Sequence, residues 1–424
     1  MIFLPPRHGK SELATRQFPA WCLGKDPDEK VICCSYNDDT AKDFNRDVQQ
    51  IMMLPAYHKV FPESRLNERN VVTVADHTVL RNAKVFQIVN HKGEYRGAGV
   101  GGTITGKGAT IGIIDDPIKN HEEAFSPTYR ERVWKWYTST FRTRGEGAFA
   151  KGGDVRIVLC MTRWHEDDLA GRLLKRAKEG GEPWHVVSMP AVADVKQCED
   201  DEREENEPLW PEKYSLQHLE DIHLDVGTLD WESLYQQRPY TPGGNIVKKK
   251  WWRFYTETPP LSQIIQSWDM SFKETSSSSY VVGIVMGIAW PNIYILDLIR
   301  KRLDFVPTLN AVRAMTAAWP MAMTKLVEDK ANGPAVINVL RDEIPGFVAV
   351  TPQGSKQARL VACTPVIEAG NVLLPQDAQW VDAFMEELAA FPNGAHDDQV
   401  DALSQGLNHI KGSPIAKLEQ LTRM

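Results

Sequence analysis

Short apolar runs alternate with helical patterns over roughly the first 190 residues, and this alternation restricts the fold more than any other feature. The runs at 31–36, 111–114 and 157–161 are rich in valine, isoleucine and cysteine. Runs of this length and composition are typical of buried strands. Strands that alternate with helices build a parallel sheet with helices packed on it. The sequence therefore predicts an α/β fold for this region.

A second set of strand-like runs begins at Ile264 and predicts a second α/β domain. Its runs lie at 264–268, 280–288, 293–299 and 324–327, and a helical pattern covers about 396–411. Between the two sets, 195–208 is acidic and polar, and 209–260 is rich in Trp, Tyr, Gln and Pro, which is typical of a connector. The predicted organisation is a first domain at 1–190, a connector at 191–262, a second domain at 263–412 and a tail at 413–424.

Composition excludes some classes of protein. The net charge is −7, which argues against a passive DNA-coating protein, because such proteins are usually basic. No apolar run approaches the roughly 18 residues that a membrane span needs. The six cysteines show no CxxC spacing, so we expect reduced thiols and a cytosolic protein.

The segment Pro6–Ser11 has the context of a phosphate-binding loop. It follows the strand-like Ile2–Leu4 and leads into a helix-compatible run at 12–15. Backbone N–H groups and the helix N-terminus bind phosphates, which predicts nucleotide contacts by Arg7, His8, Gly9, Lys10 and Ser11. Lys10 is expected to neutralise the β- and γ-phosphates and Ser11 to bind Mg²⁺. The first glycine of the usual motif is missing, so this segment alone leaves open a helix start with an incidental lysine.

The run Ile113–Asp116 supplies the second nucleotide motif, 105 residues after Lys10. We expect Asp115 to bind Mg²⁺ through water and Asp116 to orient the attacking water. An ordinary strand-to-turn Asp-Asp-Pro is the alternative. The two motifs in this order favour an ATPase. Arg7 is a candidate for stabilising the γ-phosphate, or else a structural arginine.

A polar segment, Thr162–Leu169, follows the third apolar run and suits an element that senses phosphate. His165 with Glu166, Asp167 and Asp168 also resembles a metal-binding set. We favour capping of the next helix by the acids, because Asp and Glu stabilise a first helical turn.

Three separated groups of carboxylates occur in the second half. Asp269 ends one strand-like run, Glu328 ends another, and Asp397, Asp398 and Asp401 open the last helical pattern. Such a set suits two Mg²⁺ or Mn²⁺ ions that act on a phosphodiester. Acids that merely cap helices are the alternative.

Basic segments are the candidates for DNA contact. They are Lys248–Lys250 with Arg253, Arg300–Arg302, and the pair Lys356 and Arg359. Lys and Arg contacts to phosphate give affinity without reading the base sequence. A solvated charged face is the alternative for each.

Seven motifs in order make the chain resemble the terminase large subunit family of tailed phages over nearly its whole length. They are Leu4–Glu12, Gly106–Pro117, Thr162–Leu169, Leu209–Tyr214, Tyr235–Pro239, Glu328–Gly333 and His396–Leu403. The resemblance implies an ATPase of the additional-strand P-loop type, followed by an RNase H-like nuclease. It implies that the chain translocates viral DNA with ATP and cuts concatemeric DNA with a metal ion.

The resemblance also implies site residues. Lys10, Ser11 and Asp115 match the residues that serve ATP and Mg²⁺, and Asp116 stands where the family more often has a catalytic Glu. Asp269, Glu328 and Asp398 match the nuclease carboxylates, with Asp397 as a close alternative to Asp398. Ser279 stands where relatives often have an Asp.

The implied partners are double-stranded DNA, the portal protein and a small terminase subunit. The implied assembly is a homo-oligomeric ring on the procapsid, in the host cell cytoplasm. The chain starts only a few residues before the phosphate loop, without the upstream segment that holds adenine in relatives. A truncated prophage copy that keeps only nuclease activity therefore stays open, as does a non-catalytic scaffold.

Overall fold

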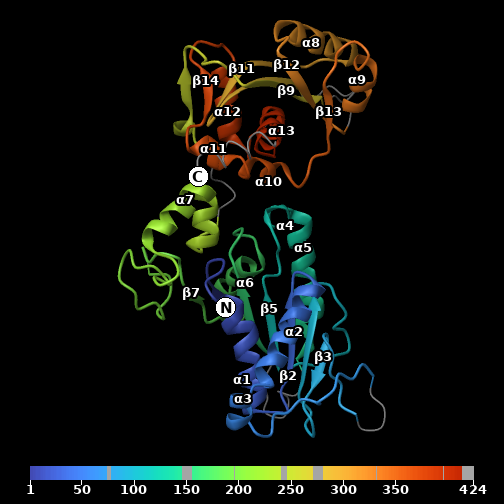
Figure 1. Cartoon of the computed structure of the whole chain (residues 1–424), viewed down its shortest axis with the longest axis vertical. Helices are drawn as coiled ribbons and strands as arrows, with labels where there is room; N and C mark the ends of the chain where they lie inside the picture. Colours follow the sequence, from blue (N-terminus) through green and yellow to red (C-terminus); the bar gives the residue numbers. More distant parts are fainter. Residues whose placement is uncertain are drawn as a thin grey trace. The chain divides into compact units, whose positions relative to one another are not determined.

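The computed structural model divides the chain into two compact units (Figure 1). Unit 1 comprises Met1–Ile222 and Asp230–Tyr240, and unit 2 comprises His223–Leu229 and Thr241–Met424. The structure describes residues 1–73, 78–145, 155–194, 196–239, 246–270, 280–330, 332–394 and 396–412. Within these ranges, no helix combines the length and the apolar character that crossing a bilayer requires.

Unit 1 is built on a sheet whose strands run in the order β3-β4-β2-β5-β6-β1-β7. The strands are β1 (Ile2–Phe3), β2 (Lys30–Ser35), β3 (Val85–Gln87), β4 (Glu94–Gly99), β5 (Ile111–Asp115), β6 (Arg156–Met161) and β7 (Val187–Ser188). All neighbours pair in parallel except β3 and β4, which are antiparallel. Strand β6 lies between β1 and β5, where the resemblance implies an additional strand. The carboxyl ends of β1, β5 and β6 therefore meet at one edge of the sheet.

The sheet of unit 1 is apolar on both faces. In β2, Val31 and Cys33 belong to one buried cluster, while Ile32 and Cys34 belong to another. Side chains alternate between the two faces of a strand, so the two clusters are the cores on opposite sides of the sheet. Burial on both faces explains why these strands read as continuous apolar runs in the sequence.

Helices cover these faces, and α2 shows why they form. Asn37 caps α2 (Asp38–Met52) by accepting the Thr40 N–H at 2.8 Å, and Phe44 and Val48 are buried four residues apart on one helix face. The remaining helices of unit 1 include η1 (Glu12–Gln17), α1 (Phe18–Lys25), α3 (Pro55–Val60), α4 (His121–Ala124), α5 (Pro127–Trp136), η2 (Tyr137–Phe141), η3 (Arg142–Arg144), α6 (Leu169–Lys178) and η5 (Trp231–Tyr235). Helix α7 (Leu216–Asp230) carries the chain from unit 1 into unit 2 and back.

Unit 2 has a mixed sheet in the order β13-β12-β9-β10-β11-β14-β8. Its strands are β8 (Arg253–Tyr255), β9 (Gln263–Met270), β10 (Val281–Ala289), β11 (Asn292–Lys301), β12 (Ala322–Glu328), β13 (Phe347–Val350) and β14 (Val372–Pro375). Strands β9, β10 and β11 form an antiparallel meander, while β12 adds in parallel to β9 and β14 in parallel to β11.

Helix α13 (Asp398–Gly412) packs directly on strand β9. The Ser267 hydroxyl donates to the Ala402 carbonyl at 2.7 Å, and the Gln405 amide donates to the Ser267 hydroxyl at 3.0 Å. The approach is close at Gly406, where an added Cβ would lie 2.5 Å from the Met286 side chain. The other helices of unit 2 include η6 (Lys249–Trp251), α8 (Phe305–Ala318), α9 (Gly333–Leu340), α10 (Lys356–Val361), α11 (Thr364–Glu368) and α12 (Val381–Ala390).

The two-sheet α/β organisation predicted from the sequence is confirmed. The predicted strands correspond to β2, β5, β6, β9, β10, β11 and β12, each within two residues at either end, and the last helix to α13. Unit 1 extends past the predicted boundary at residue 190, since the segment up to Ile222 packs with it. The role of 191–262 as a connector stays a prediction, and the tail at 413–424 and Ser279 lie outside the described residues.

Candidate functional site

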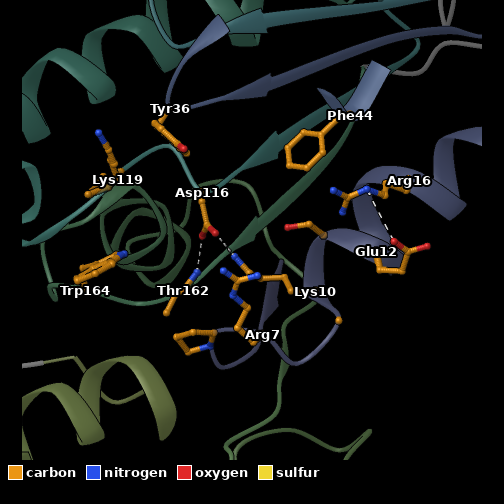
Figure 2. A pocket seen from close by; sticks show the side chains of 14 residues that line it. Arg7, Lys10, Glu12, Arg16, Tyr36, Phe44, Asp116, Lys119, Thr162 and Trp164 are labelled. Atoms are coloured by element: carbon orange, nitrogen blue, oxygen red, sulfur yellow. Dashed lines mark hydrogen bonds and ion pairs between the residues drawn. The ribbon is translucent and has the colours of Figure 1, made fainter. Parts of the chain in front are cut away.

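A cavity of about 580 Å³ opens in unit 1 at the carboxyl edge of the parallel strands (Figure 2). The loop after β1 lines it with Arg7, Gly9, Lys10 and Ser11, among others. Three more lining residues come from the ends of neighbouring strands, with Tyr36 after β2, Asp116 after β5 and Thr162 after β6. The topology therefore brings the predicted phosphate loop and the predicted second motif to one cavity.

The loop itself has the backbone shape that needs glycine. Gly9 has a φ of 84°, while an added Cβ would meet no atom within 4 Å, so the requirement comes from the backbone and not from space. Helical hydrogen bonding begins at once, because the Leu13 N–H donates to the Gly9 carbonyl at 3.0 Å. The N-terminal N–H groups of η1 thus lie at the cavity, where they suit an anion.

His8 is the one predicted loop residue whose side chain is not part of the described cavity lining. Its ring is buried, stacks on Tyr214 at a centroid distance of 4.5 Å, and has Nδ1 2.8 Å from the Pro6 carbonyl oxygen. Burial lowers the pKa of His8, which favours the neutral ring. The His8 side chain therefore packs on Tyr214 and not in the described cavity lining. A contact between the His8 backbone and phosphate stays a prediction.

Lys10 forms an ion pair with Asp116, and its Nζ lies 3.7 Å from Asp115 Oδ1. The Lys10 side chain is 6% exposed. Its burial acts to lower its pKa, but the two carboxylates outweigh that effect and raise the pKa, so the ammonium stays charged. Asp116, with a φ of 42°, also accepts the Thr162 N–H at 2.8 Å. Figure 2 shows Asp116 linked to both Lys10 and Thr162.

Asp115 lies deeper than Asp116 and is 1% exposed. It accepts a hydrogen bond from the Thr15 hydroxyl at 2.6 Å and another from the Ser11 hydroxyl. Burial raises the pKa of Asp115, and nearby Lys10 opposes that rise. The structure thus brings together Ser11 and Asp115, the pair predicted to serve Mg²⁺. A hydroxyl beside a carboxylate is a fitting oxygen donor set for this hard cation.

In the segment after β6, the predicted capping role is confirmed for Asp168 alone, because the first turn of α6 contains no acid. Asp168 caps α6 by accepting the Gly171 N–H at 2.8 Å, and it pairs with Arg163 at 2.9 Å. His165 is buried beside them, and burial lowers its pKa to about 4. A neutral ring and a capping carboxylate account for these residues without a metal ion.

In unit 2 the strand registers bring the predicted acids to one region. Val327 of β12 pairs with Trp268 of β9, so Glu328 and Asp269 lie side by side on adjacent strands. Asp269 is 4% exposed. Trp268 and Val327 belong to the core under one face of the sheet, so Asp269 lies on the other face, where α13 packs. Asp398, at the start of α13, accepts the N–H of Tyr280, which directly precedes β10.

Two cations from α10 occupy the neighbouring acids. Lys356 Nζ lies 2.7 Å from Asp397 Oδ1 and 2.6 Å from Asp401 Oδ2, and Arg359 Nη2 lies 2.5 Å from Asp401 Oδ1. Burial raises the pKa of Glu328, and the Asp401 charge adds to that rise. Burial also raises the pKa of Asp398, although the hydrogen bond from Tyr280 opposes it.

The described residues do not by themselves assemble the predicted two-ion cluster. Within the described part of the chain, no three Asp, Glu, His or Cys side chains converge as a metal-binding group. Asp397, one of the predicted metal ligands, is paired with a lysine instead. The assignment of Asp269, Glu328, Asp397 and Asp398 as metal ligands stays a prediction.

Several basic residues predicted to contact DNA have partners within unit 2. Arg300 Nη2 lies 2.9 Å from Glu387 Oε2, and its guanidinium lies 3.8 Å from the centre of the Tyr280 ring. Lys249 Nζ is 3.8 Å from Glu386 Oε1, but both side chains are largely exposed, so that pair contributes little. Lys356 and Arg359 pair with carboxylates of unit 2, whereas the sequence suggested that they contact DNA phosphate.

Models of two protein families match the chain. The model described as terminase large subunit, T4likevirus-type, N-terminal, matches residues 1–222, and the model described as terminase RNaseH-like domain matches residues 266–410. The chain belongs to the terminase large subunit family. The family predicted from the seven motifs is thereby confirmed. A search among curated proteins found no match.

A solved large terminase shares this fold, and a terminase nuclease is a weaker match. The large terminase of a thermophilic bacteriophage, in crystal form 2, is 12% identical, with 96% of this chain and 93% of that chain covered and a TM-score of 0.52. The same phage protein in complex with ATP-gamma-S is 10% identical over 96% of this chain and 92% of that chain, with a TM-score of 0.50. The large terminase nuclease of thermophilic phage G20c with bound magnesium is 14% identical over 40% of this chain and 98% of that chain, with a TM-score of 0.31.

Sequence motifs missed some residues that build these terminase sites. Thr15 supports Asp115, and the Thr162 N–H holds Asp116. Thr162 stood in a motif, but the motif assigned no role to its backbone N–H. Asp401 was noted as a third acid without an assigned partner, and its two cations come from a helix 42 residues or more upstream.

Proposed function

We propose that this large terminase is an ATP-driven motor that moves double-stranded DNA into a procapsid and cuts it with a metal-dependent nuclease. The observation that carries the proposal is the cavity of unit 1, where a buried Lys10 lies beside Asp115 and Asp116. A fully charged lysine without solvent around it has an anion as its natural ligand, and a phosphate loop supplies the surrounding N–H donors.

The residues of the cavity fit a nucleotide with its Mg²⁺. Gly9, Lys10 and Ser11 would hold the phosphates, and Ser11 with Asp115 would hold the ion, which neutralises phosphate charge when bound. The large terminase of the thermophilic bacteriophage, which shares the fold, has been solved with ADP and with ATP-gamma-S. Arg7 lines the same cavity, where it would add positive charge at the phosphates.

The ion pair between Lys10 and Asp116 suggests a role for each residue when the nucleotide binds. Lys10 must exchange Asp116 for a phosphate oxygen when the nucleotide binds. Asp116 is then free to orient the attacking water, while its second oxygen stays bonded to the Thr162 N–H. Thr162 opens the segment that leads through Arg163 to α6. The release of Asp116 from Lys10 would therefore couple phosphate binding to the segment at the end of β6, because Asp116 is bonded to Thr162.

For the nuclease, Asp269, Glu328 and Asp398 are the proposed catalytic carboxylates. Register and helix packing bring all three to one region of unit 2, in the segment matched by the RNaseH-like model. Mg²⁺ or Mn²⁺ is the expected ion, because hard cations prefer carboxylate oxygens.

The proposed partners follow from membership of the family. They are the DNA itself, the portal protein and a small terminase subunit, with several copies of this chain forming a ring on the procapsid. The proposed place of action is the cytoplasm of the host cell, before the mature virion forms.

One set of reactions tests both activities. Purified protein is incubated with plasmid, ATP and Mg²⁺ or Mn²⁺, and cleavage and phosphate release are followed in the same tubes, with Asp269→Asn as the matched variant. We expect both activities in the wild type and loss of cleavage alone in Asp269→Asn. Cleavage without ATP turnover would establish the nuclease-only alternative, and the absence of both would contradict the proposal.

A further inference from the structure

The turn that opens the phosphate loop carries an arginine at a position that favours glycine. The His8 N–H donates to the Pro5 carbonyl at 3.4 Å, so Pro6 and Arg7 are the central residues of a turn. Arg7 has a φ of 62°, in the left-handed region. Proline followed by a positive φ is typical of a type II turn, in which the second central residue is usually glycine. Such a strained backbone persists only where neighbouring groups hold it.

A lysine from a distant segment holds the Arg7 backbone. Lys213 Nζ donates to the Arg7 carbonyl at 3.0 Å, across 206 residues. The same ammonium lies 4.7 Å from the centre of the Trp210 ring and 5.2 Å from the centre of the Tyr214 ring. The Lys213 side chain is exposed, and its attraction to the two rings restricts where it points. The N–H groups of Lys213 and Tyr214 both donate to the Trp210 carbonyl, at 3.1 and 2.8 Å, so these residues form one turn.

Tyr214 holds the residue that follows Arg7. Its ring stacks on the His8 ring with 4.5 Å between the centroids. The His8 side chain is 5% exposed, and its Nδ1 lies 2.8 Å from the Pro6 carbonyl oxygen. Tyr214 also stacks on His218 of α7, at 5.7 Å. The ring of His8 is therefore fixed between the turn and Tyr214, and the chain is held on both sides of the Arg7 side chain.

The Arg7 side chain itself is exposed and lines the nucleotide cavity. Figure 2 shows it beside Lys10 and Asp116. An arginine side chain has many rotamers, so it supplies charge at a given place only when its backbone directs it there. The left-handed conformation of Arg7 sets that direction, and the groups that stabilise this conformation decide where the guanidinium lies.

We propose that Lys213 and Tyr214 position Arg7 at the nucleotide phosphates by holding the backbone on either side of its side chain. The inference rests on the nucleotide part of the proposed function. Neither residue belongs to the described lining of the cavity, so each acts through the loop and is a positioning residue. The motif at 209–214 thereby gains a role in ATP hydrolysis.

Steady-state phosphate release by the full chain at increasing ATP concentration tests the inference. Lys213→Met keeps the length of the side chain and loses the donor to Arg7, so kcat should fall about tenfold while KM changes by less than about twofold. Tyr214→Leu loses the stacked ring and should behave in the same way. Lys213→Arg keeps the donor and Tyr214→Phe keeps the ring, so both should retain the wild-type kcat. Glu212→Gln, at an exposed neighbour in the same segment, is the matched control.

A double variant separates positioning from general support of the fold. In an Arg7→Met background, Lys213→Met should lower kcat no further, because the positioned guanidinium is already gone while the carbonyl that Lys213 bonds remains. A Lys213→Met protein with the wild-type kcat overturns the inference. An equal loss of kcat in both backgrounds also overturns it, since Lys213 would then only support the loop. The proposed ATPase fails separately, if the wild type releases no phosphate from ATP.

Discussion

The two sites of this terminase pair a lysine with two carboxylates, but they bury opposite charges. In unit 1, Lys10 is 6% exposed and its partner Asp116 is 32% exposed. In unit 2, Asp401 is 5% exposed and its partner Lys356 is 43% exposed. In each pair the fold buries one member, and the other is partly exposed to solvent.

This difference predicts what each site binds. When Asp116 leaves, a buried cation remains and attracts an anion, which suits the phosphates of a nucleotide. When Lys356 leaves, Asp401 keeps Arg359 at 2.5 Å, so only its other oxygen becomes available to a cation. A buried charge that loses a close partner is costly, so each site favours a replacement of the same sign as the group that leaves, and more so in unit 1, where the remaining partner of Lys10, Asp115, is 3.7 Å away.

The largest expected effect comes from removing the buried cation. Lys10→Met keeps the length of the side chain and removes its charge, so ATP hydrolysis should fall by about 100-fold or more, as for other losses of a buried stabilising donor. Phosphate release measures the change. Lys25→Met, at the exposed end of α1, is the matched control and should hydrolyse ATP at the wild-type rate. A Lys10→Met rate within tenfold of the wild type would show that Lys10 does not serve the nucleotide.

Removing the buried anion should cost stability instead. Asp401→Asn leaves Arg359 nearly buried without its carboxylate, so unit 2 should lose about 3 kcal/mol of unfolding free energy. Asp397→Asn is the matched control, because both Asp397 and Lys356 are about 40% exposed and such pairs contribute roughly 0–1 kcal/mol. Hydrogen exchange of peptides from α13 in increasing urea measures both. Equal losses in the two variants would remove the distinction between buried and exposed acids.

Acid should affect unit 1 through His165, whose pKa is lowered from 6.5 to about 4 by burial. Between these values the unfolded chain binds more protons than the folded one, so the stability from the neutral ring, fully present at pH 7.5, is lost as the pH falls through 6.5 towards 4. The expected loss between pH 7.5 and pH 5 is roughly 2 kcal/mol.

The comparison for this prediction is His165→Asn, whose side-chain oxygen can still accept the Asp167 N–H that Nδ1 accepts at 2.9 Å. Thermal unfolding of both proteins at pH 7.5 and pH 5 gives the difference. If the variant is destabilised by acid as much as the wild type, His165 is not the responsible group.

The smallest effect concerns how closely α13 approaches the sheet. In Gly406→Ala the new Cβ would lie 2.5 Å from the end of the buried Met286 side chain, which must shift. Overpacking of this kind costs about 1–3 kcal/mol, and better helix propensity returns about 1 kcal/mol, so we expect a net loss of about 1 kcal/mol. Gly412→Ala, where a Cβ would meet no atom within 4 Å, should not destabilise the protein. Urea unfolding of both variants decides whether the contact matters.

The parts of the molecule that were predictable are those in which one short segment contains both the strand and the residue at its end. Asp115, Asp269 and Glu328 each close an apolar run, so the sequence indicates the strand and its terminal acid together. The parallel order of such strands then brings their ends together. The additional strand β6 was implied by the family and found between β1 and β5.

The pairing of charges was not predictable, because it depends on tertiary packing. Lys10 meets Asp116 across 106 residues, and Arg359 meets Asp401 across 42. Composition gives the number of charged residues but does not show which of them form ion pairs. For the same reason Lys356 and Arg359 suggested contacts to phosphate, although in the folded chain their partners are carboxylates.

The path of the chain through α7 has a practical consequence for dividing this protein. The chain leaves unit 1 after Ile222, returns to it at Asp230 and leaves again after Tyr240. The excursion is anchored in unit 2, where the Thr228 N–H and hydroxyl both donate to Glu368, at 2.9 and 2.7 Å. A cut after residue 222 leaves that anchor with the second unit but takes residues 230–240 from the first, and a cut after residue 240 takes the anchor from the second unit. No single stop codon separates the two halves cleanly, so genetic dissection works better with point substitutions than with truncations.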